Sequence, residues 1–281
     1  MALSNFIPAV WSARALVNLN KTLVYGNIVN RDFEGDIREK GDTVKINSIG
    51  AVTVGSYTKD VNIGDPQTLT DAQTTLLINQ ADYVNFQIDD VDRAQQTPKV
   101  MDIAMRESAY GIANAADSYI AGLYTGVAVG NTIGDDIAPI VPTATTAYEK
   151  LVDLSTLLDE ANVPSDDRWV VLPPWYYGLL LKDDRFVKAG TSAADQALRN
   201  GLVGEAAGLM VYKSNNVPNV AAAKYKIIAG QRRAISFADQ ISSIEAYRPE
   251  KRFADAVKGL HLYGAKLVYP SAIAVLTANK S

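Results

Sequence analysis

The chain of 281 residues contains no cysteine and only one histidine, His261. No disulfide can stabilise the fold, which fits a reducing compartment such as the cytosol. A Ser-His-Asp triad would have to use His261, yet no Gly-x-Ser-x-Gly turn surrounds any serine. A zinc site would need acidic ligands in place of further histidine or cysteine. We therefore expect His261 to be a structural residue, either packed into a strand over 260–269 or facing out of it.

A large excess of charge of one sign is also missing, because the formal net charge is −4. This balance argues against general adhesion to nucleic acid or to an anionic membrane. The charge is unevenly placed, however. Residues 224–281 carry ten Lys or Arg and four Asp or Glu, which leaves a net charge of −10 for residues 1–223. The asymmetry can help neighbouring copies to attract one another, although single surface pairs contribute little.

Long apolar runs and phosphate-binding motifs are absent as well. Residues 118–134 form an uncharged stretch at the short limit for a membrane span, but four glycines interrupt it. The first residues lack the basic and hydrophobic regions of a signal peptide, so we expect no secretion. The glycines match neither a P-loop nor a dinucleotide-binding pattern, and pairs such as Arg232-Arg233 are too small for a DNA footprint.

Acidic doublets are the remaining candidates for metal chemistry. They occur at Asp89-Asp90, Asp135-Asp136, Asp166-Asp167 and Asp183-Asp184. Paired carboxylates can bind Mg²⁺ or Ca²⁺, but each doublet falls at a predicted turn or helix start, where Asp is favoured for capping. We therefore expect structural turns, with no metal and no cofactor. A metal-dependent hydrolase using Asp89 and Asp90 stays open as an alternative.

The most regular feature that is present is an apolar stripe over residues 97–124. Apolar residues recur at positions 101, 105, 109, 112, 116, 119 and 123, which is the period of one helix face. Thr97 and Pro98 suit the start of a helix. At 1.5 Å per residue the helix would be roughly 40 Å long. The spacing predicts a backbone helix for an extended, plate-like subunit.

Two other segments lack partners within the chain. Residues 10–25 predict a short amphipathic helix, with Trp11 at its start and Leu16 and Leu19 at helical spacing. Apolar alternation over 43–56 and 76–88, around a polar tip, predicts a two-stranded ribbon that leaves the body and returns at Asp89. Isolated ribbons are poorly stable in water, and their open edges favour pairing with another chain. We expect neighbouring copies to complete both segments.

The remainder alternates helices and strands, so the centre is a mixed α/β unit and the class is α+β. Predicted helices cover residues 147–161 and 175–181, and predicted strands cover 169–172, 209–212, 225–229, 241–247, 260–269 and 272–276. A charged corner, Arg248-Pro-Glu-Lys-Arg-Phe253, separates two of these strands. No internal repeat is visible.

Four stretches, at 27–47, 76–124, 204–218 and 230–270, follow one another in an order that resembles the major capsid (coat) proteins of tailed bacteriophages. Encapsulin shells and the herpesvirus capsid floor share that fold. The resemblance implies an N-terminal arm, an extended β-hairpin loop, a peripheral domain with a long spine helix, and an axial α/β domain. The implied bounds are 1–39 for the arm, 40–90 for the extended loop, 91–130 for the peripheral domain with its spine helix, 131–235 for the axial domain, 236–270 for the returning peripheral strands, and 271–281 for the C-terminal strand and tail.

The same resemblance implies a structural protein and not an enzyme. It would assemble with itself, as hexamers and pentamers, into an icosahedral shell that encloses double-stranded DNA without sequence-specific binding and without a membrane. The virion would be assembled in the host bacterial cytoplasm with a portal protein, and a decoration protein would be a further partner. No long coiled N-terminal segment is visible, so a separate scaffolding protein is expected. An encapsulin compartment that binds cargo enzymes is the alternative with the same fold.

The resemblance and the unpartnered segments together indicate which residues contact neighbouring subunits. The expected contact residues are Trp11, Leu16 and Leu19 for docking of the arm, Lys59, Asp60 and Asp65 at the ribbon tip, and Arg248, Glu250, Lys251 and Arg252 at a corner where three subunits meet. Some relatives crosslink covalently through a loop lysine. Lys59 is the only lysine near this tip.

Overall fold

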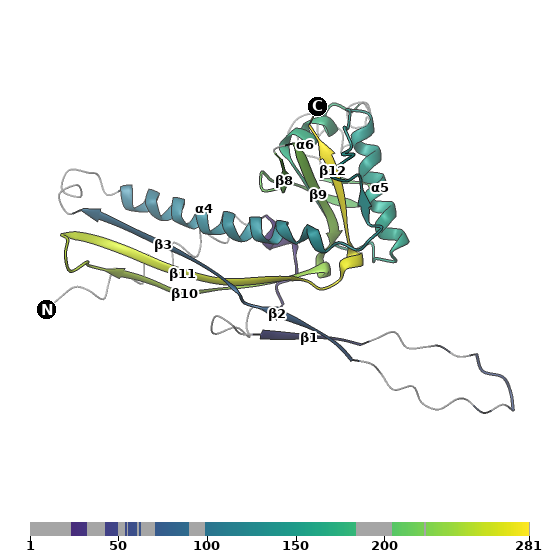
Figure 1. Cartoon of the computed structure of the whole chain (residues 1–281), viewed down its shortest axis with the longest axis horizontal. Helices are drawn as coiled ribbons and strands as arrows, with labels where there is room; N and C mark the ends of the chain where they lie inside the picture. The colour runs from purple at the N-terminus through teal and green to yellow at the C-terminus, as the bar shows by residue number, and fades with distance from the viewer. Residues whose placement is uncertain are drawn as a thin grey trace.

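The long helix α4 forms the axis of an elongated molecule (Figure 1). The computed structural model describes residues 24–32, 43–49, 54, 56–60, 62, 71–89, 99–183, 204–221 and 223–280. Helix α4 spans Lys99–Ala121 and continues as the 3₁₀ turn η2, Gly122–Gly126. The predicted helix over 97–124 is therefore confirmed. Its stripe faces inward as expected, because Met105, Ala109 and Ala116 are buried.

A three-stranded antiparallel sheet lies against one side of α4, and we call this pair of layers the elongated unit. The strands are β10 (Ile235–Tyr247), β11 (Ala254–Leu267) and β3 (Gln80–Asp89), in that order across the sheet. The charged corner at 248–253 joins β10 to β11, as the sequence predicts. The pairing of β10 with β11 shifts in register between Ile241 and Ser243, as at a β-bulge.

The ribbon is shorter than the sequence pattern predicts. Strands β1 (Thr43–Ile49) and β2 (Asp71–Leu77) pair antiparallel and leave the body together (Figure 1). The alternation at Val84 and Phe86 was expected to belong to this ribbon, and that expectation is wrong, because β3 pairs with β11 along its whole length. Because β3 pairs with β11, one face of β3 can pack against α4. A strand of a free ribbon would leave that face exposed to water.

The compact unit sits at the C-terminal end of α4 and contains a seven-stranded sheet (Figure 1). Its strands are β4 (Thr132–Ile133), β5 (Arg168–Leu172), β6 (Glu205–Ala206), β7 (Leu209–Lys213), β8 (Asn219–Val220), β9 (Lys224–Gln231) and β12 (Ile273–Asn279). The order is β4-β12-β9-β5-β7-β6, with β8 beside β9. The C-terminal strand thus returns to this sheet, and two short 3₁₀ turns, η3 (Arg232–Ala234) and η4 (Pro270–Ala272), connect the units.

Two helices complete the compact unit. Helix α5 (Thr146–Glu160) buries Ala147, Leu151, Leu154 and Leu158 on one side, which is the predicted amphipathic pattern. Helix α6 (Pro174–Leu180) begins at a proline, and its buried Tyr176 donates a hydrogen bond of 2.9 Å to the carbonyl oxygen of Ala147. The central strand β5 is buried at every position, as a doubly covered strand requires.

A short N-terminal segment crosses the junction of the two units. Its one-turn helix α2 covers Tyr25–Ile28, and the ring of Tyr25 packs edge-on against Trp169 of β5 at a centroid distance of 6.4 Å. Asn30 then pairs with Ser236 at the start of β10. The predicted helix over 10–25 lies almost wholly outside the described residues. Within the described ranges, no helix is long and apolar enough to cross a membrane.

Candidate subunit interface

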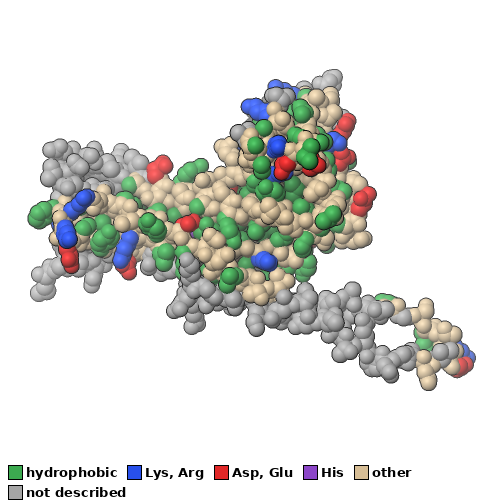
Figure 2. All heavy atoms as spheres, viewed as in Figure 1, with side chains coloured by type: hydrophobic (Ala, Val, Ile, Leu, Met, Phe, Trp, Pro, Cys, Tyr) green, Lys and Arg blue, Asp and Glu red, His purple; other side chains and the backbone are tan. Residues whose placement is uncertain are grey.

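The charged corner lies at the far end of the elongated unit, away from the compact unit (Figure 1). The corner residues Arg248, Glu250, Lys251 and Arg252 are all exposed, and the neighbouring Phe253 is 80% exposed. Figure 2 shows basic, acidic and apolar side chains gathered at this end. An exposed aromatic ring beside several charges is a composition found at protein contacts. The role of the corner as a subunit junction stays a prediction.

The tip of the ribbon lies at the opposite end of the molecule (Figure 1). Lys59 and Asp60 form a turn there, and Asp60 adopts a positive φ of 64°, a conformation that Asp tolerates in turns. Nearby, Val54 is 93% exposed and Tyr57 is 75% exposed. The remaining expected contact residues, Trp11, Leu16, Leu19 and Asp65, lie outside the described residues. The structure does not bring the tip and the corner together within one chain.

The root of the ribbon is fixed firmly to the elongated unit. Leu76 and Ile78 are fully buried and form a small apolar cluster with Ala238 of β10 and Leu262 of β11. The backbone of the ribbon crosses β11 at Gly264, where a Cβ atom would overlap the carbonyl oxygen of Leu77 and lie 2.9 Å from Cδ1 of Ile78. This close crossing sets the direction in which the ribbon leaves the body. Sequence reasoning did not single out Gly264.

We expect Gly264→Ala to lower the free energy of unfolding by about 1–3 kcal/mol, because the added methyl group must push the ribbon backbone away. Gly111→Ala is the matched control. Gly111 lies within α4, and a methyl group added there would meet no atom within 4 Å, so this change should stabilise the chain by about 0.5–1 kcal/mol. Urea unfolding of both variants measures the difference. If both substitutions change the free energy of unfolding by the same small amount, the close crossing of the ribbon and β11 at Gly264 is contradicted.

His261 belongs to a buried polar cluster on the side of the sheet that faces α4. Its Nε2 atom lies 3.3 Å from Oδ2 of Asp239, whose Oδ1 accepts a hydrogen bond of 2.7 Å from Arg31. The adjacent ring of Tyr263 stacks on His261 at 5.0 Å, and its hydroxyl donates to Asp82 at 2.8 Å. Burial, followed by the hydrogen bond to Asp82, raises the pKa of Tyr263. Of the two expectations for His261, packing into the sheet is the one observed.

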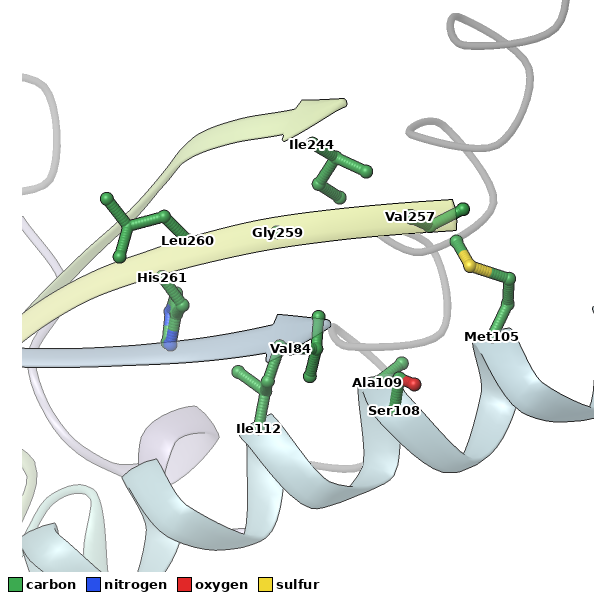
Figure 3. A pocket seen from close by; sticks show the side chains of 10 residues that line it. All are labelled: Val84, Met105, Ser108, Ala109, Ile112, Ile244, Val257, Gly259, Leu260 and His261. Carbon is green, nitrogen blue, oxygen red and sulfur yellow. The ribbon is translucent and has the colours of Figure 1, made fainter. Parts of the chain in front are cut away.

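A small apolar cavity lies beside this cluster, between α4 and the sheet (Figure 3). Its volume is about 30 Å³, and its walls include Val84, Met105, Ile112, Val257 and His261. A space of that size holds about one water molecule and is far too small for a substrate. The cavity is a packing gap between helix and sheet.

Of the acidic doublets, Asp166-Asp167 lies in a turn and Asp135 caps backbone groups of its own loop, whereas Asp183 is buried outside any turn. Oδ1 of Asp135 accepts hydrogen bonds from the backbone N–H groups of Ala138 at 2.6 Å and Ile137 at 2.8 Å, and these bonds lower the pKa of Asp135. Asp136 instead pairs with Lys226 at 2.8 Å. Asp90 and the side chain of Asp89 lie outside the described residues. Among the side chains that are described, no three acidic or histidine groups gather closely enough to hold a metal ion.

Asp117 ties three parts of the chain together. It lies on α4 and is 1% exposed. Its Oδ1 accepts hydrogen bonds from the backbone N–H groups of Val24 at 3.0 Å and Tyr25 at 2.6 Å, and its Oδ2 accepts one of 3.0 Å from the amide of Asn216. The carboxylate thus joins the N-terminal segment, the long helix and a loop of the compact unit. Burial raises its pKa although the hydrogen bonds act in the opposite direction.

Taken together, these features describe a folded body with exposed extensions at both ends. Comparison with solved structures finds the same architecture in viral shells. A structure from Mycobacterium phage Che8 is 28% identical with a TM-score of 0.75, and the match covers 90% of each chain. The capsid structure of cyanophage P-SCSP1u is 16% identical with a TM-score of 0.70, covering 92% of this chain and 89% of that one.

A virus-like particle from Pyrococcus furiosus shares the fold at 14% identity and a TM-score of 0.59, with 95% of this chain and 97% of that chain covered. No curated protein matches the sequence. The family model described as phage capsid protein matches residues 73–276, a span that includes the long helix, both sheets and the charged corner. This chain belongs to the phage capsid protein family.

Proposed function

We propose that copies of this chain form hexamers and pentamers that close into the icosahedral head of a tailed phage around double-stranded DNA. The observation that carries the proposal is the family membership combined with extensions whose side chains stay exposed among the residues that the structure describes. The ribbon tip exposes Val54 and Tyr57, and the opposite end exposes Phe253. Contacts between copies would bury these groups, and many modest contacts repeated over a shell give a stable particle.

In this proposal each extension has its own task. The ribbon, with Lys59, Asp60 and Asp65 at its tip, would lie across an adjacent subunit. The arm would dock through Trp11, Leu16 and Leu19. The corner with Arg248, Glu250, Lys251 and Arg252 would meet two other copies. The compact unit would correspond to the axial domain, around the fivefold and sixfold positions, and the elongated unit to the peripheral domain.

The proposed partners follow the same scheme. A separate scaffolding protein and a portal protein would assist assembly in the bacterial cytoplasm, and a decoration protein would bind the finished head. The role is structural, so no substrate or cofactor is assigned. The net charge of −4 suits a shell that encloses DNA without gripping it.

Electron microscopy of the purified chain, expressed alone and with its neighbouring genes, tests the proposal. We expect closed shells that contain DNA and a portal protein when the neighbouring genes are present. Shells that instead contain a cargo enzyme would favour an encapsulin compartment, a reading supported by the shared fold of the Pyrococcus furiosus particle. A stable monomer at high concentration, under both conditions, would contradict both readings.

A further inference from the structure

Residues 24–32 form a strap across the junction of the compact and elongated units. Tyr25, Ile28 and Val29 of this strap are buried in the apolar core that the two units share. The strap also lies between the two extensions of the chain, because residues 1–23 precede it and the ribbon follows it. How firmly each unit holds the strap therefore decides how the extensions and the units are linked.

The start of the strap is attached to α4 of the elongated unit. The backbone N–H groups of Val24 and Tyr25 donate to Oδ1 of Asp117 at 3.0 and 2.6 Å, and helix α2 packs against α4. The loss of an acceptor by a buried N–H group is strongly disfavoured. This end of the strap is therefore held by the long helix.

The end of the strap is attached to β10 of the same unit. Asn30 donates its backbone N–H to Ile235 at 3.0 Å, and its carbonyl oxygen accepts from Phe237 at 2.8 Å. Arg31 forms an ion pair of 2.7 Å with Asp239, and its guanidinium carbon lies 5.5 Å from the ring centroid of Phe237. The elongated unit thus holds the strap at both of its ends.

The compact unit holds the strap less completely. The ring of Tyr25 packs edge-on against Trp169 of β5, but Tyr25 Oη and Trp169 Nε1 are both buried without a hydrogen-bond partner among the described residues. Beside this contact lies a polar cleft of about 110 Å³, lined by Asn27 and Ile28 of the strap and by Trp169 and Tyr212 of the compact unit. Unpaired buried polar atoms weaken the contact that buries them, and the cleft has room for several water molecules.

We propose that the strap is a clasp that fixes the angle between the two units, and that the contact of Tyr25 with Trp169 is the part that opens. When it opens, the strap stays on the elongated unit and the compact unit turns about the connections η3 and η4. The hydrogen bond from Asn216 of the compact unit to Asp117 has to break as well. Water that enters the widened cleft would bind Tyr25 Oη and Trp169 Nε1, which offsets part of the apolar contact that is lost. The closed and open arrangements therefore differ by a modest free energy, as a switching element requires.

The clasp gives the extensions a route to the compact unit. Residues 1–23 lead directly into Val24, the neighbour of Tyr25. Docking of this N-terminal segment on another copy would act on the start of the strap and so bias the contact with Trp169. This coupling between copies rests on the proposed function. The clasp itself is a property of the single chain and can be tested without assembly.

Single-molecule energy transfer in the full chain tests the clasp at concentrations too low for assembly. The chain has no cysteine, so dyes attach only to introduced pairs of cysteines at exposed positions. The first pair, Asp32→Cys with Glu160→Cys, reports the distance from the strap to α5 of the compact unit. The second pair, Asp32→Cys with Gln87→Cys, reports the distance from the strap to β3 of the elongated unit. In the otherwise unchanged chain, each pair should give one main distance.

Tyr25→Ala removes the ring and should raise the ratio of open to closed molecules at least about tenfold, seen as a second distance for the first pair alone. Tyr25→Phe keeps the ring and removes only the unpaired hydroxyl, so it should not raise this ratio. Tyr176→Ala is the matched control, because it removes an equally buried ring within the compact unit. It should leave both distances unchanged.

Circular dichroism checks that each variant folds, and Tyr25→Leu and Tyr176→Leu replace the alanine variants where those do not fold. A single, unchanged distance for the first pair without the Tyr25 ring would overturn the clasp, since other contacts would then fix the angle. A shift of the second pair would also overturn it, because the strap itself would have left the elongated unit. None of these results depends on the formation of shells. Failure of the clasp and failure of the proposed function are therefore separate outcomes.

Discussion

Deletion of residues 57–71 is expected to leave a chain that folds but no longer forms stable shells. The deletion removes the tip with Lys59, Asp60 and Asp65 and joins the two ribbon strands by a short loop. Thr43–Ile49 pairs with Asp71–Leu77 in register, so Ser48 still has Ala72 as its partner after the deletion. The root of the ribbon, with Leu76 and Ile78 buried against the sheet, is untouched.

The two expected effects have different sizes because the described residues near the tip are largely exposed in their own chain. Tyr57 is 75% exposed and Val54 is 93% exposed, so the free energy of unfolding should change by no more than about 0.5–1 kcal/mol. The loss of overlap between copies should lower the particle yield by at least about tenfold at equal protein concentration. Sedimentation and urea unfolding measure the two quantities separately.

A matched variant with Lys59→Ala and Asp60→Ala keeps the length of the ribbon. It should assemble better than the deletion variant, because exposed charges contribute less than a whole strand of overlap. Shells of normal yield and stability from the deletion variant would rule out the overlap role of the ribbon. A large loss of monomer stability would instead show that the tip serves its own chain.

The regular elements of the body are predictable from the sequence because local periodicity determines them. The apolar spacing over 97–124 predicts α4 within a few residues, and the stripe at Leu151, Leu154 and Leu158 predicts α5. The strand over 169–172 is expected from an apolar run ended by two prolines, and it is observed as β5. The charged corner at 248–253 is also found where the turn residues indicate.

Long-range contacts are not predictable in the same way. The alternation of Val84 and Phe86 fits a free ribbon as well as a sheet strand, and only the pairing of β3 with β11 decides between them. In the sequence, Gly264 is one glycine within a predicted strand. Nothing near it indicates that the backbone at Leu77 and Ile78 crosses there. The contact of Asp117 with Val24 and Tyr25 joins residues more than ninety positions apart. No local pattern contains that information.

The carboxylate of Asp117 gives the second large prediction. Asp117→Ala should lower the free energy of unfolding by about 3 kcal/mol or more, because two backbone N–H groups and the amide of Asn216 lose a buried acceptor. Asp117→Asn is the matched control. Its carbonyl oxygen can still accept from Val24 and Tyr25, and a rotated Asn216 amide can accept from its nitrogen, so the cost at neutral pH should be about 1 kcal/mol or less. Chemical unfolding of the unassembled chain at low concentration measures both changes.

The pH dependence of the free energy of unfolding distinguishes the effect of the charge of Asp117 from the effect of its hydrogen bonds. Burial raises the pKa of this carboxyl group above its ordinary value of 3.8, so the folded chain binds the proton more tightly than the unfolded chain does. The contribution of Asp117 to stability is therefore most favourable below 3.8 and declines as the pH rises through the raised value. Since Asn does not titrate, the unchanged chain should lose stability relative to Asp117→Asn across the range just above pH 3.8. A difference between the two chains that stays constant with pH, or that grows in favour of the unchanged chain, would contradict a carboxylate whose burial outweighs its hydrogen bonds.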